Sequence, residues 1–211
     1  VKVRWINGAY CIYDSYTQRI VDAFGQNVHK YVNDFTALAT DDTTGDPTEF
    51  TTTVVEVGTG DSTAYINVDA QGGWLRINAA ANEDDGVNLQ HKGEAFKLTS
   101  GDSLYFGAKI KFDQATQSDY LIGLCIGSNT TLLGGMTDGV YFRSVDGSAA
   151  MTFVTEKDST ETETTAVTTA VAATEYTLEF FCDSTCTVYA YVNVSLVATH
   201  TTNLPDDEAL C

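Results

Sequence analysis

The chain has 211 residues, of which 43% are hydrophobic, and carries a formal charge of −18 from 11 basic and 29 acidic residues. This length suits one sandwich domain with a real hydrophobic core and an additional arm, rather than two full domains. The acidic balance argues against nucleic acid as a partner, because the long-range field repels phosphate backbones. A membrane is not expected as a partner either, since neither a signal peptide nor an apolar run long enough to span a bilayer is recognisable.

The first 35 residues stand outside the strand pattern of the rest and are expected to form an N-terminal arm. Two short apolar runs flank Asn7-Gly8, a dipeptide that favours a type I′ hairpin turn. Further on, a short helix is predicted, with Asp14 or Ser15 as its cap and Gly25 as a weak point, because apolar residues recur at helical spacing: Ile20, Phe24, Val28 and Tyr31. Such a segment either packs on its own sandwich or docks on a neighbouring subunit, and the sequence leaves both open.

The stretch 104–125 sets the fold class. Its first half alternates apolar and polar residues with a period of two, which predicts a strand with one face on a core. Its second half contains the near-continuous apolar run 120–126, which is typical of a strand buried on both faces. We interpret the pair as a central β-hairpin.

Strand patterns separated by turn signals continue along the rest of the chain. They cover residues 53–57, 64–68, 74–79, 87–90, 94–98, 140–145, 150–154, 158–169, 176–180, 188–194 and 196–199. The Thr-rich stretch 158–169 is interpreted as a solvent-facing edge strand. This regular spacing predicts an all-β fold, a two-sheet antiparallel jelly-roll sandwich over residues 36–211, with residues 1–35 as the arm.

The sequence shows no recognisable catalytic or metal motif. His29, His91 and His200 lie in separate segments without the context of a nucleophile or a metal site. Acidic residues such as Glu94, Glu175 and Glu179 are isolated along the chain and are interpreted as solvated. A protein without enzymatic activity, metal or cofactor is therefore predicted, with a glycosidase that uses an unrecognised carboxylate pair as a remote alternative.

Residues 82–86 form the densest cluster of oxygen ligands, with Asn82, Asp84 and Asp85 as candidate ligand or calcium residues. Their spacing does not follow the EF-hand pattern, so a solvated turn is favoured over a calcium loop. Glycan binding stays open as an alternative, because Tyr189 and Tyr191 on one strand face could stack on a sugar.

The five cysteines are interpreted mainly as reduced thiols. Cys182 and Cys186 flank three residues and could face each other across a hairpin loop, so a disulfide between them stays open.

A family resemblance is carried by a series of segments between residues 35 and 210. These segments are TTTVVEVGTGDS, GGWLRINAAANEDDGVNLQHKGEAFKL, LYFGAKIKF, TQSDYLIGL, TTLLGGMTDGVYFRSVDG, VTEKDST and TNLPDDEAL. The chain resembles virion structural proteins of tailed bacteriophages with a concanavalin-A-like or laminin-G-like jelly roll. Members of such families continue with another strand or two past the segment that matches residues 202–210. The resemblance therefore implies either that the last strands lie beyond this sequence or that another segment, such as the N-terminal hairpin, completes the sheet.

The resemblance also implies a biological role. It implies a capsid decoration or cement protein on the virion surface, assembled in the host cytoplasm, with the major capsid protein and sister subunits as partners. A homo-oligomer is expected, a trimer being one closed arrangement. The arm is expected to supply the interface through its apolar residues Trp5, Tyr10, Ile12, Tyr13, Ile20, Phe24 and Tyr31. A glycan-binding, lectin-like module of a tail fibre or adhesin is the alternative.

Overall fold

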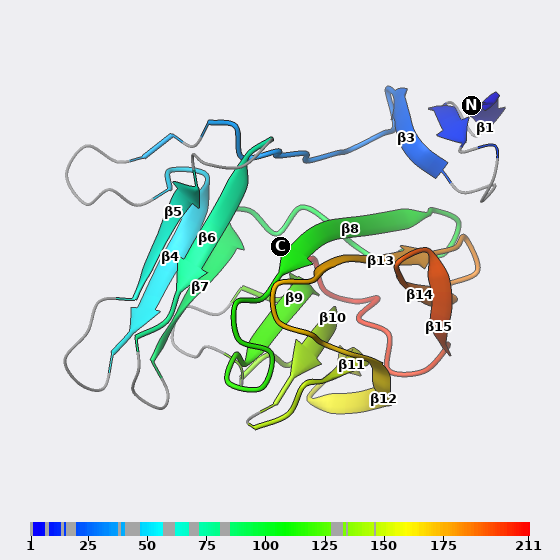
Figure 1. Cartoon of the computed structure of the whole chain (residues 1–211). Coiled ribbons are helices and arrows are strands. Elements are labelled where there is room, and N and C mark those ends of the chain that lie inside the picture. The colour runs from blue at the N-terminus through cyan, green and yellow to red at the C-terminus, as the bar shows by residue number, and fades with distance from the viewer. Residues whose placement is uncertain are drawn as a thin grey trace.

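The computed structural model describes residues 2–6, 9–13, 15, 20–37, 39–40, 47–56, 62–67, 72–80, 85–127, 133, 135–145 and 147–211. Within these ranges the chain is all-β, and every regular element is a strand (Figure 1). The paired strands are antiparallel throughout. The predicted fold class, a two-sheet antiparallel sandwich of the jelly-roll type, is confirmed.

Two four-stranded sheets form the sandwich. We call the first sandwich sheet the one with the order β15 (Ser195–His200), β14 (Val188–Val192), β13 (Glu175–Cys182) and β8 (Leu104–Lys111). The second sandwich sheet has the order β12 (Thr160–Thr169), β11 (Ala150–Lys157), β10 (Gly139–Ser144) and β9 (Tyr120–Cys125). As the sequence predicted, β12 is an edge strand with largely exposed side chains.

Phenylalanine rings from both sheets fill the core. Phe106 stacks on Phe180 within the first sandwich sheet, with ring centroids 4.9 Å apart. Phe180 faces Phe153 of the second sheet at 6.2 Å, and Phe153 lies 5.0 Å from Phe142. The alternation of side chains along each strand places these rings on the inner faces, so burial of the rings joins the two sheets.

The interpretation of residues 104–125 as a hairpin is wrong. β8 pairs with β13, whereas β9 pairs with β10 in the opposite sheet. Residues 112–119 connect them, and this is longer than the two to five residues of a typical hairpin loop. Both strands carry an apolar face that needs the same core, so the chain crosses from one sheet to the other. Phe112 stacks on Tyr120 with ring centroids 4.4 Å apart, and this contact joins the two ends of the connection.

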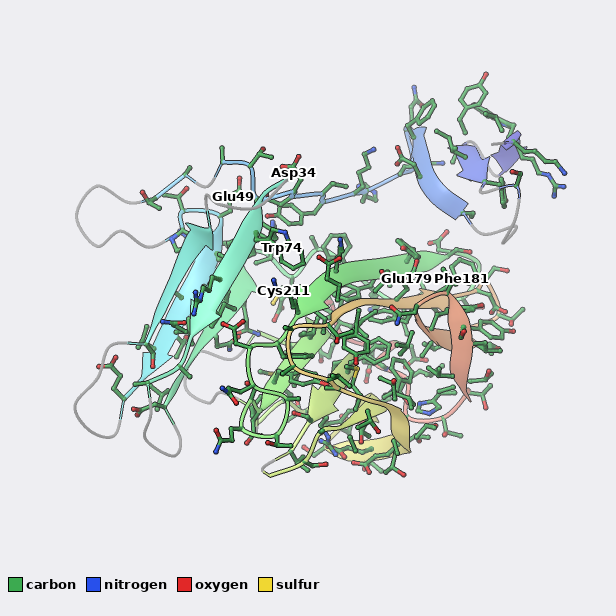
Figure 2. The ribbon with its side chains drawn as sticks, viewed as in Figure 1. Asp34, Glu49, Trp74, Glu179, Phe181 and Cys211 are labelled. Atoms are coloured by element: carbon green, nitrogen blue, oxygen red, sulfur yellow. The ribbon has the colours of Figure 1, made fainter. Side chains whose placement is uncertain are left out.

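Two smaller sheets precede the sandwich in sequence. β4 (Phe50–Val55) pairs with β7 (Gly86–His91), and β5 (Thr63–Asn67) pairs with β6 (Trp74–Asn78). Figure 2 shows Trp74 on the side of β6 that lies toward β8. Its ring centroid lies 5.4 Å from the Lys109 Nζ and 5.5 Å from the Lys111 Nζ, so cation–π contacts join β6 to the outer face of β8.

The N-terminal residues form a separate sheet of three strands. β1 (Lys2–Ile6) and β2 (Ala9–Tyr13) form the predicted hairpin, with Ile6 opposite Ala9. The predicted helix is wrong, because β3 (Ile20–Gly25) is a strand that pairs with β2. The β-branched residues at the start of β3 and the cross-strand contact of Phe24 with Tyr10 favour the extended form over the helical spacing.

The C-terminal residues pair with the sandwich by backbone hydrogen bonds. Leu210 exchanges hydrogen bonds with Phe96, and Cys211 exchanges them with Cys125 at the end of β9. The N-terminal hairpin belongs to its own sheet, so the alternative that this hairpin completes a sandwich sheet is wrong.

All five cysteines are free thiols. Burial raises the pKa of Cys182 to about 12, and its Sγ donates to the carbonyl of Asp183 at 3.6 Å. A thiol with so high a pKa is a weak nucleophile and a slow partner in disulfide exchange.

Candidate functional site

Three aromatic side chains form one row across the N-terminal sheet. Trp5 lies opposite Tyr10, and Tyr10 lies opposite Phe24. The ring centroids are 4.4 Å apart for the first pair and 5.7 Å for the second. The three side chains are nevertheless 61%, 47% and 49% exposed, respectively. β1, β2 and β3 pack mainly on one another, so this aromatic row is open to a partner.

The remaining arm residues divide between the two faces of this sheet. Ile12 shares the face of Tyr10, two residues along β2, and is half-buried. Tyr13 and its cross-strand partner Ile20 belong to the opposite face, where the guanidinium of Arg4 lies 5.4 Å from the Tyr13 ring centroid. We define the arm face as Val3, Trp5, Tyr10, Ile12 and Phe24.

Tyr31 lies apart from the arm face and anchors the linker that follows the sheet. Its hydroxyl donates to Glu49 Oε2 at 2.8 Å, and its ring lies 4.8 Å from the ring of His91. Nearby, Gly73 passes so close to Phe35 that a Cβ at this position would overlap the Phe35 backbone. These contacts hold the linker against β4, β7 and the start of β6. They involve residues 31–35 and not the strands of the N-terminal sheet.

The predicted calcium loop falls mostly outside the described residues. Asn82 and Asp84 lie outside them, and Asp85 is half-buried just before β7. In the part of the chain that the structure describes, no group of three or more His, Cys, Asp or Glu residues could hold a metal ion. A calcium role for this loop stays a prediction.

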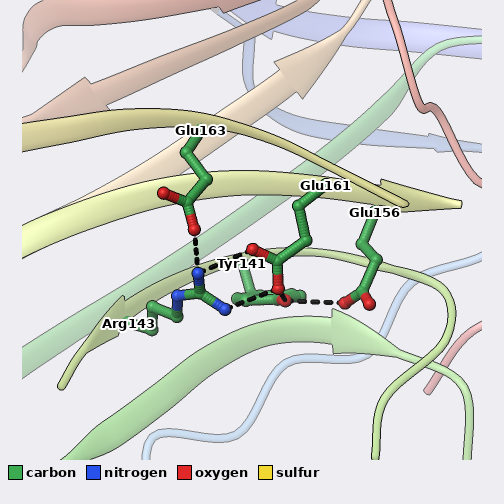
Figure 3. A network of polar contacts seen from close by, with 5 residues as sticks. All are labelled: Tyr141, Arg143, Glu156, Glu161 and Glu163. Atoms are coloured by element: carbon green, nitrogen blue, oxygen red, sulfur yellow. Dashed lines mark hydrogen bonds and ion pairs between the residues drawn. The ribbon is translucent and has the colours of Figure 1, made fainter. Parts of the chain in front are cut away.

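A polar network lies on the outer face of the second sandwich sheet (Figure 3). The guanidinium of Arg143 binds Glu161 in a bidentate ion pair, with N–O distances of 2.6 and 2.7 Å, and also contacts Glu163. The hydroxyl of Tyr141 donates to Glu156 Oε2 at 2.7 Å. The residues come from β10, β11 and β12, and the strand register places them on one face.

The environment separates the pKa values of these carboxyl groups. The hydrogen bonds from Arg143 lower the pKa of Glu161. Burial raises the pKa of Glu156, which is only 5% exposed, and the hydrogen bond with Glu161 raises the pKa of Glu163. Pairs with separated pKa values are typical of acid–base sites. Here, however, the cavity beside Arg143 measures about 140 Å³, well below the several hundred Å³ of most ligand pockets. The arrangement therefore suits a clamp that fixes β12 to β10 and β11.

Glu156→Gln is expected to raise the free energy of unfolding at pH 7 by about 1 kcal/mol, because it removes a buried charge and keeps an acceptor for Tyr141. A raised pKa means that Glu156 favours the folded state at low pH and disfavours it as pH rises through its folded pKa. The gain should therefore shrink toward pH 4. Urea unfolding at both pH values tests this. Tyr141→Phe, which removes the donor instead of the charge, is the control and should lower the free energy of unfolding by about 1–3 kcal/mol at pH 7. A Gln variant less stable at pH 7 would contradict the charge argument.

A second, larger cavity of about 380 Å³ lies beside the ends of the sandwich strands. Hydroxyl, amide and charged side chains dominate its lining: Lys157, Thr185, Thr187, Thr201, Asn203 and Asp206. The Lys157 ammonium contacts Asp206 and Asp207 at 2.5 and 3.2 Å. Such a lining offers both donors and acceptors to a polyhydroxylated ligand.

The sequence had predicted the arm aromatics but neither polar site. The alternation of Glu161 and Glu163 is the one local signal for the network, since residues two apart share a strand face. Its cationic partner Arg143 is 18 residues from Glu161, and only the pairing of three strands brings them together.

The described residues contain no helix long and apolar enough to span a membrane. Neither a known protein family nor a curated protein sequence matches this chain.

Proposed function

We propose that this protein is a non-enzymatic virion structural protein that decorates or cements the outside of a tailed-phage capsid through subunit contacts. The observation that carries this proposal is the arm face, with its row of three exposed aromatic side chains on a sheet apart from the sandwich. At ~25 cal/mol per Å², covering ~100 Å² on each ring contributes about 2.5 kcal/mol per ring. On a particle with many copies, such contacts add up through multivalency.

The acidic sandwich supports the same role. Its high net charge keeps closely spaced copies soluble and disfavours contact between sandwich edges. The polar network holds β12 on the second sandwich sheet. The hydrogen bonds of His200 with Thr155 and Thr164 join β15 of the first sandwich sheet to the second one.

The test is the location of the protein on purified particles of the phage that encodes it. Cryo-electron microscopy with the protein labelled should show it on the head exterior. Replacing Trp5, Tyr10 and Phe24 by threonine, which keeps β-propensity, should remove it from the particles while the sandwich unfolds at an unchanged temperature. Val171→Ala, which truncates an exposed residue of the sandwich, serves as the matched control. Label on tail fibres alone, or particles that retain the triple variant, would contradict the proposal.

The cavity of about 380 Å³ favours one second candidate, a glycan-binding module of a tail fibre or adhesin. A glycan array with and without calcium tests it. Sharp selectivity for one sugar that Thr187→Val and Asn203→Ala abolish would establish this function. An array without signal would remove it.

A further inference from the structure

Two cysteines lie in the tight turn between β13 and β14. We define the cysteine turn as residues 182–187. The Asp183 N–H donates to the Thr187 carbonyl at 3.0 Å, and the Cys186 N–H donates to the Asp183 carbonyl at 2.9 Å. These bonds enclose a three-residue hairpin loop, a type whose last residue adopts the left-handed conformation. In this chain that residue is Cys186, with a φ of 57°.

Cysteine is an unusual residue at a left-handed position. Glycine is the residue that this backbone conformation favours, because it has no Cβ to clash with the carbonyl that follows. Other residues in such conformations cluster at sites where the side chain has a role. The Cys186 side chain is half-buried against the core, and it also lines the cavity of about 380 Å³. A small molecule in that cavity can therefore contact the Cys186 thiol.

The thiols of Cys182 and Cys186 are neighbours. Cys182 lies opposite Val188 across β13 and β14, and Cys186 precedes Val188 by two residues, so both cysteine side chains project to the same side. Both pack on the same hydrophobic core. Burial raises the pKa of Cys182, and a hydrogen bond with the Cys186 side chain adds to this rise. The two sulfur atoms are therefore in contact while both thiols are reduced.

Polar contacts hold the cysteine turn in this conformation. The Asp183 Oδ1 accepts hydrogen bonds from the Thr185 N–H at 2.9 Å, the Thr185 hydroxyl at 2.7 Å and the Thr187 N–H at 3.0 Å. From outside the turn, the Gly101 N–H donates to the Ser184 carbonyl at 2.9 Å. The fold thus keeps the two thiols together without a covalent bond, and such proximity favours a reaction between them.

We propose that Cys182 and Cys186 form a reversible thiol–disulfide site, which an external small-molecule disulfide oxidises to a bond across the cysteine turn. The deprotonated Sγ of Cys186 attacks one sulfur of the external disulfide, whose S–S bond breaks and releases one thiolate. The Cys182 Sγ then attacks the Cys186 Sγ of this mixed disulfide and releases the second thiolate. The two thiolates take up the two protons that the cysteines lose, so two protein thiols are oxidised and one external disulfide is reduced.

The bond changes the cavity beside the turn. Thr185, Cys186 and Thr187 contribute to the lining of this cavity. When the bond forms, Cys186 loses its thiol and the loop can no longer move away from Cys182. A reducing cytoplasm keeps such thiols free and an oxidising exterior favours the bond, so the site responds to a change of compartment. The inference goes beyond the proposed function and does not depend on it, because the chemistry needs only the two thiols and an external disulfide.

Equilibration of the full chain with 2-mercaptoethanol and its disulfide, bis(2-hydroxyethyl) disulfide, tests the site. This reagent is uncharged, so the acidic protein does not repel it. Mass spectrometry should show the loss of two hydrogen atoms, and peptide mapping should assign the bond to Cys182 and Cys186. The mixed disulfide at Cys186 should appear first, because Cys182 is the slower thiol. The equilibrium constant for the internal bond should be at least about tenfold larger in the folded protein than in urea, because the folded turn already holds the loop ends together.

Three single variants assign the roles of the thiols. Cys182→Ala should stop at the mixed disulfide on Cys186, because the second thiol is missing. Cys186→Ser should leave Cys182 unmodified, since Cys182 is only 2% exposed. Cys211→Ser is the matched control, because it removes another half-buried thiol and should form the internal bond as the unchanged protein does.

Three outcomes overturn the proposal. The first is an unchanged protein that keeps the mixed disulfide at equilibrium and forms no internal bond. The second is an internal bond that joins a different pair of cysteines. The third is an equilibrium constant that is no larger in the folded protein than in urea, because the bond would then reflect only the short separation of the two cysteines in sequence.

Discussion

Phe180→Ala is expected to lower the free energy of unfolding by about 3–5 kcal/mol, the usual cost of removing a fully buried phenylalanine. Phe180 has no exposed surface and contacts rings of both sheets, Phe106 at 4.9 Å and Phe153 at 6.2 Å between centroids. Alanine would leave a cavity where the sheets meet, and the surrounding strands can collapse only in part. For a chain of this length the melting temperature should fall by about 6–20 °C.

Phe181→Ala is the matched control for Phe180→Ala. The two residues are neighbours on β13, but Phe181 points outward and is half-buried. Its truncation should cost about 1 kcal/mol, since less apolar surface returns to water. Urea unfolding monitored by circular dichroism measures both variants. Equal losses for the two variants would contradict the assignment of the core face.

Acidification below pH 6.5 is expected to destabilise the protein through His200. This side chain is buried between the sheets, where its Nδ1 lies 3.0 Å from Thr155 Oγ1 and its Nε2 lies 2.9 Å from Thr164 Oγ1. Burial lowers the pKa of His200 below 6.5, the value expected in the unfolded chain. The unfolded chain thus binds the proton first, and the stability present above pH 6.5 is lost as pH falls toward the folded pKa. The slope reaches at most about 1.4 kcal/mol per pH unit.

His200→Gln isolates this contribution. The amide can still form hydrogen bonds with Thr155 and Thr164 but does not titrate, so the variant should lose the slope between pH 6.5 and 5. The difference in unfolding free energy between the two proteins, measured in urea across this range, reports the titration of His200 alone. An identical pH dependence in both proteins would contradict it.

In the two sandwich sheets, the sequence alone indicated which residues form strands and which face of β8 enters the core, whereas it predicted β3 as part of a helix. Residues 104–112 alternate strictly, and the inward set found in β8 is the apolar set of that pattern. The turn signal at Asn7-Gly8 correctly placed the hairpin β1–β2. These features are local, since backbone twist and a period of two act over a few residues.

Predictions from local sequence patterns were wrong where the same residues are compatible with two different structures. The spacing of Ile20 and Phe24 is compatible with a helix, but pairing with β2 stabilises a strand instead. Likewise, the apolar faces of β8 and β9 are compatible with a hairpin within one sheet or with strands in two facing sheets. Packing of both faces into the same core favours the second arrangement. Such choices depend on contacts between distant segments, which no window of sequence contains.

For function, the sequence by itself proposed seven apolar arm residues as an interface, Trp5, Tyr10 and Phe24 among them, because apolar residues outside the strand repeat need a surface to cover them. Only the tertiary structure decided that these three form one exposed row and that Tyr31 anchors the linker. The physical reason is register: pairing between strands sets which side chains meet, and a shift of one residue would send them to opposite faces.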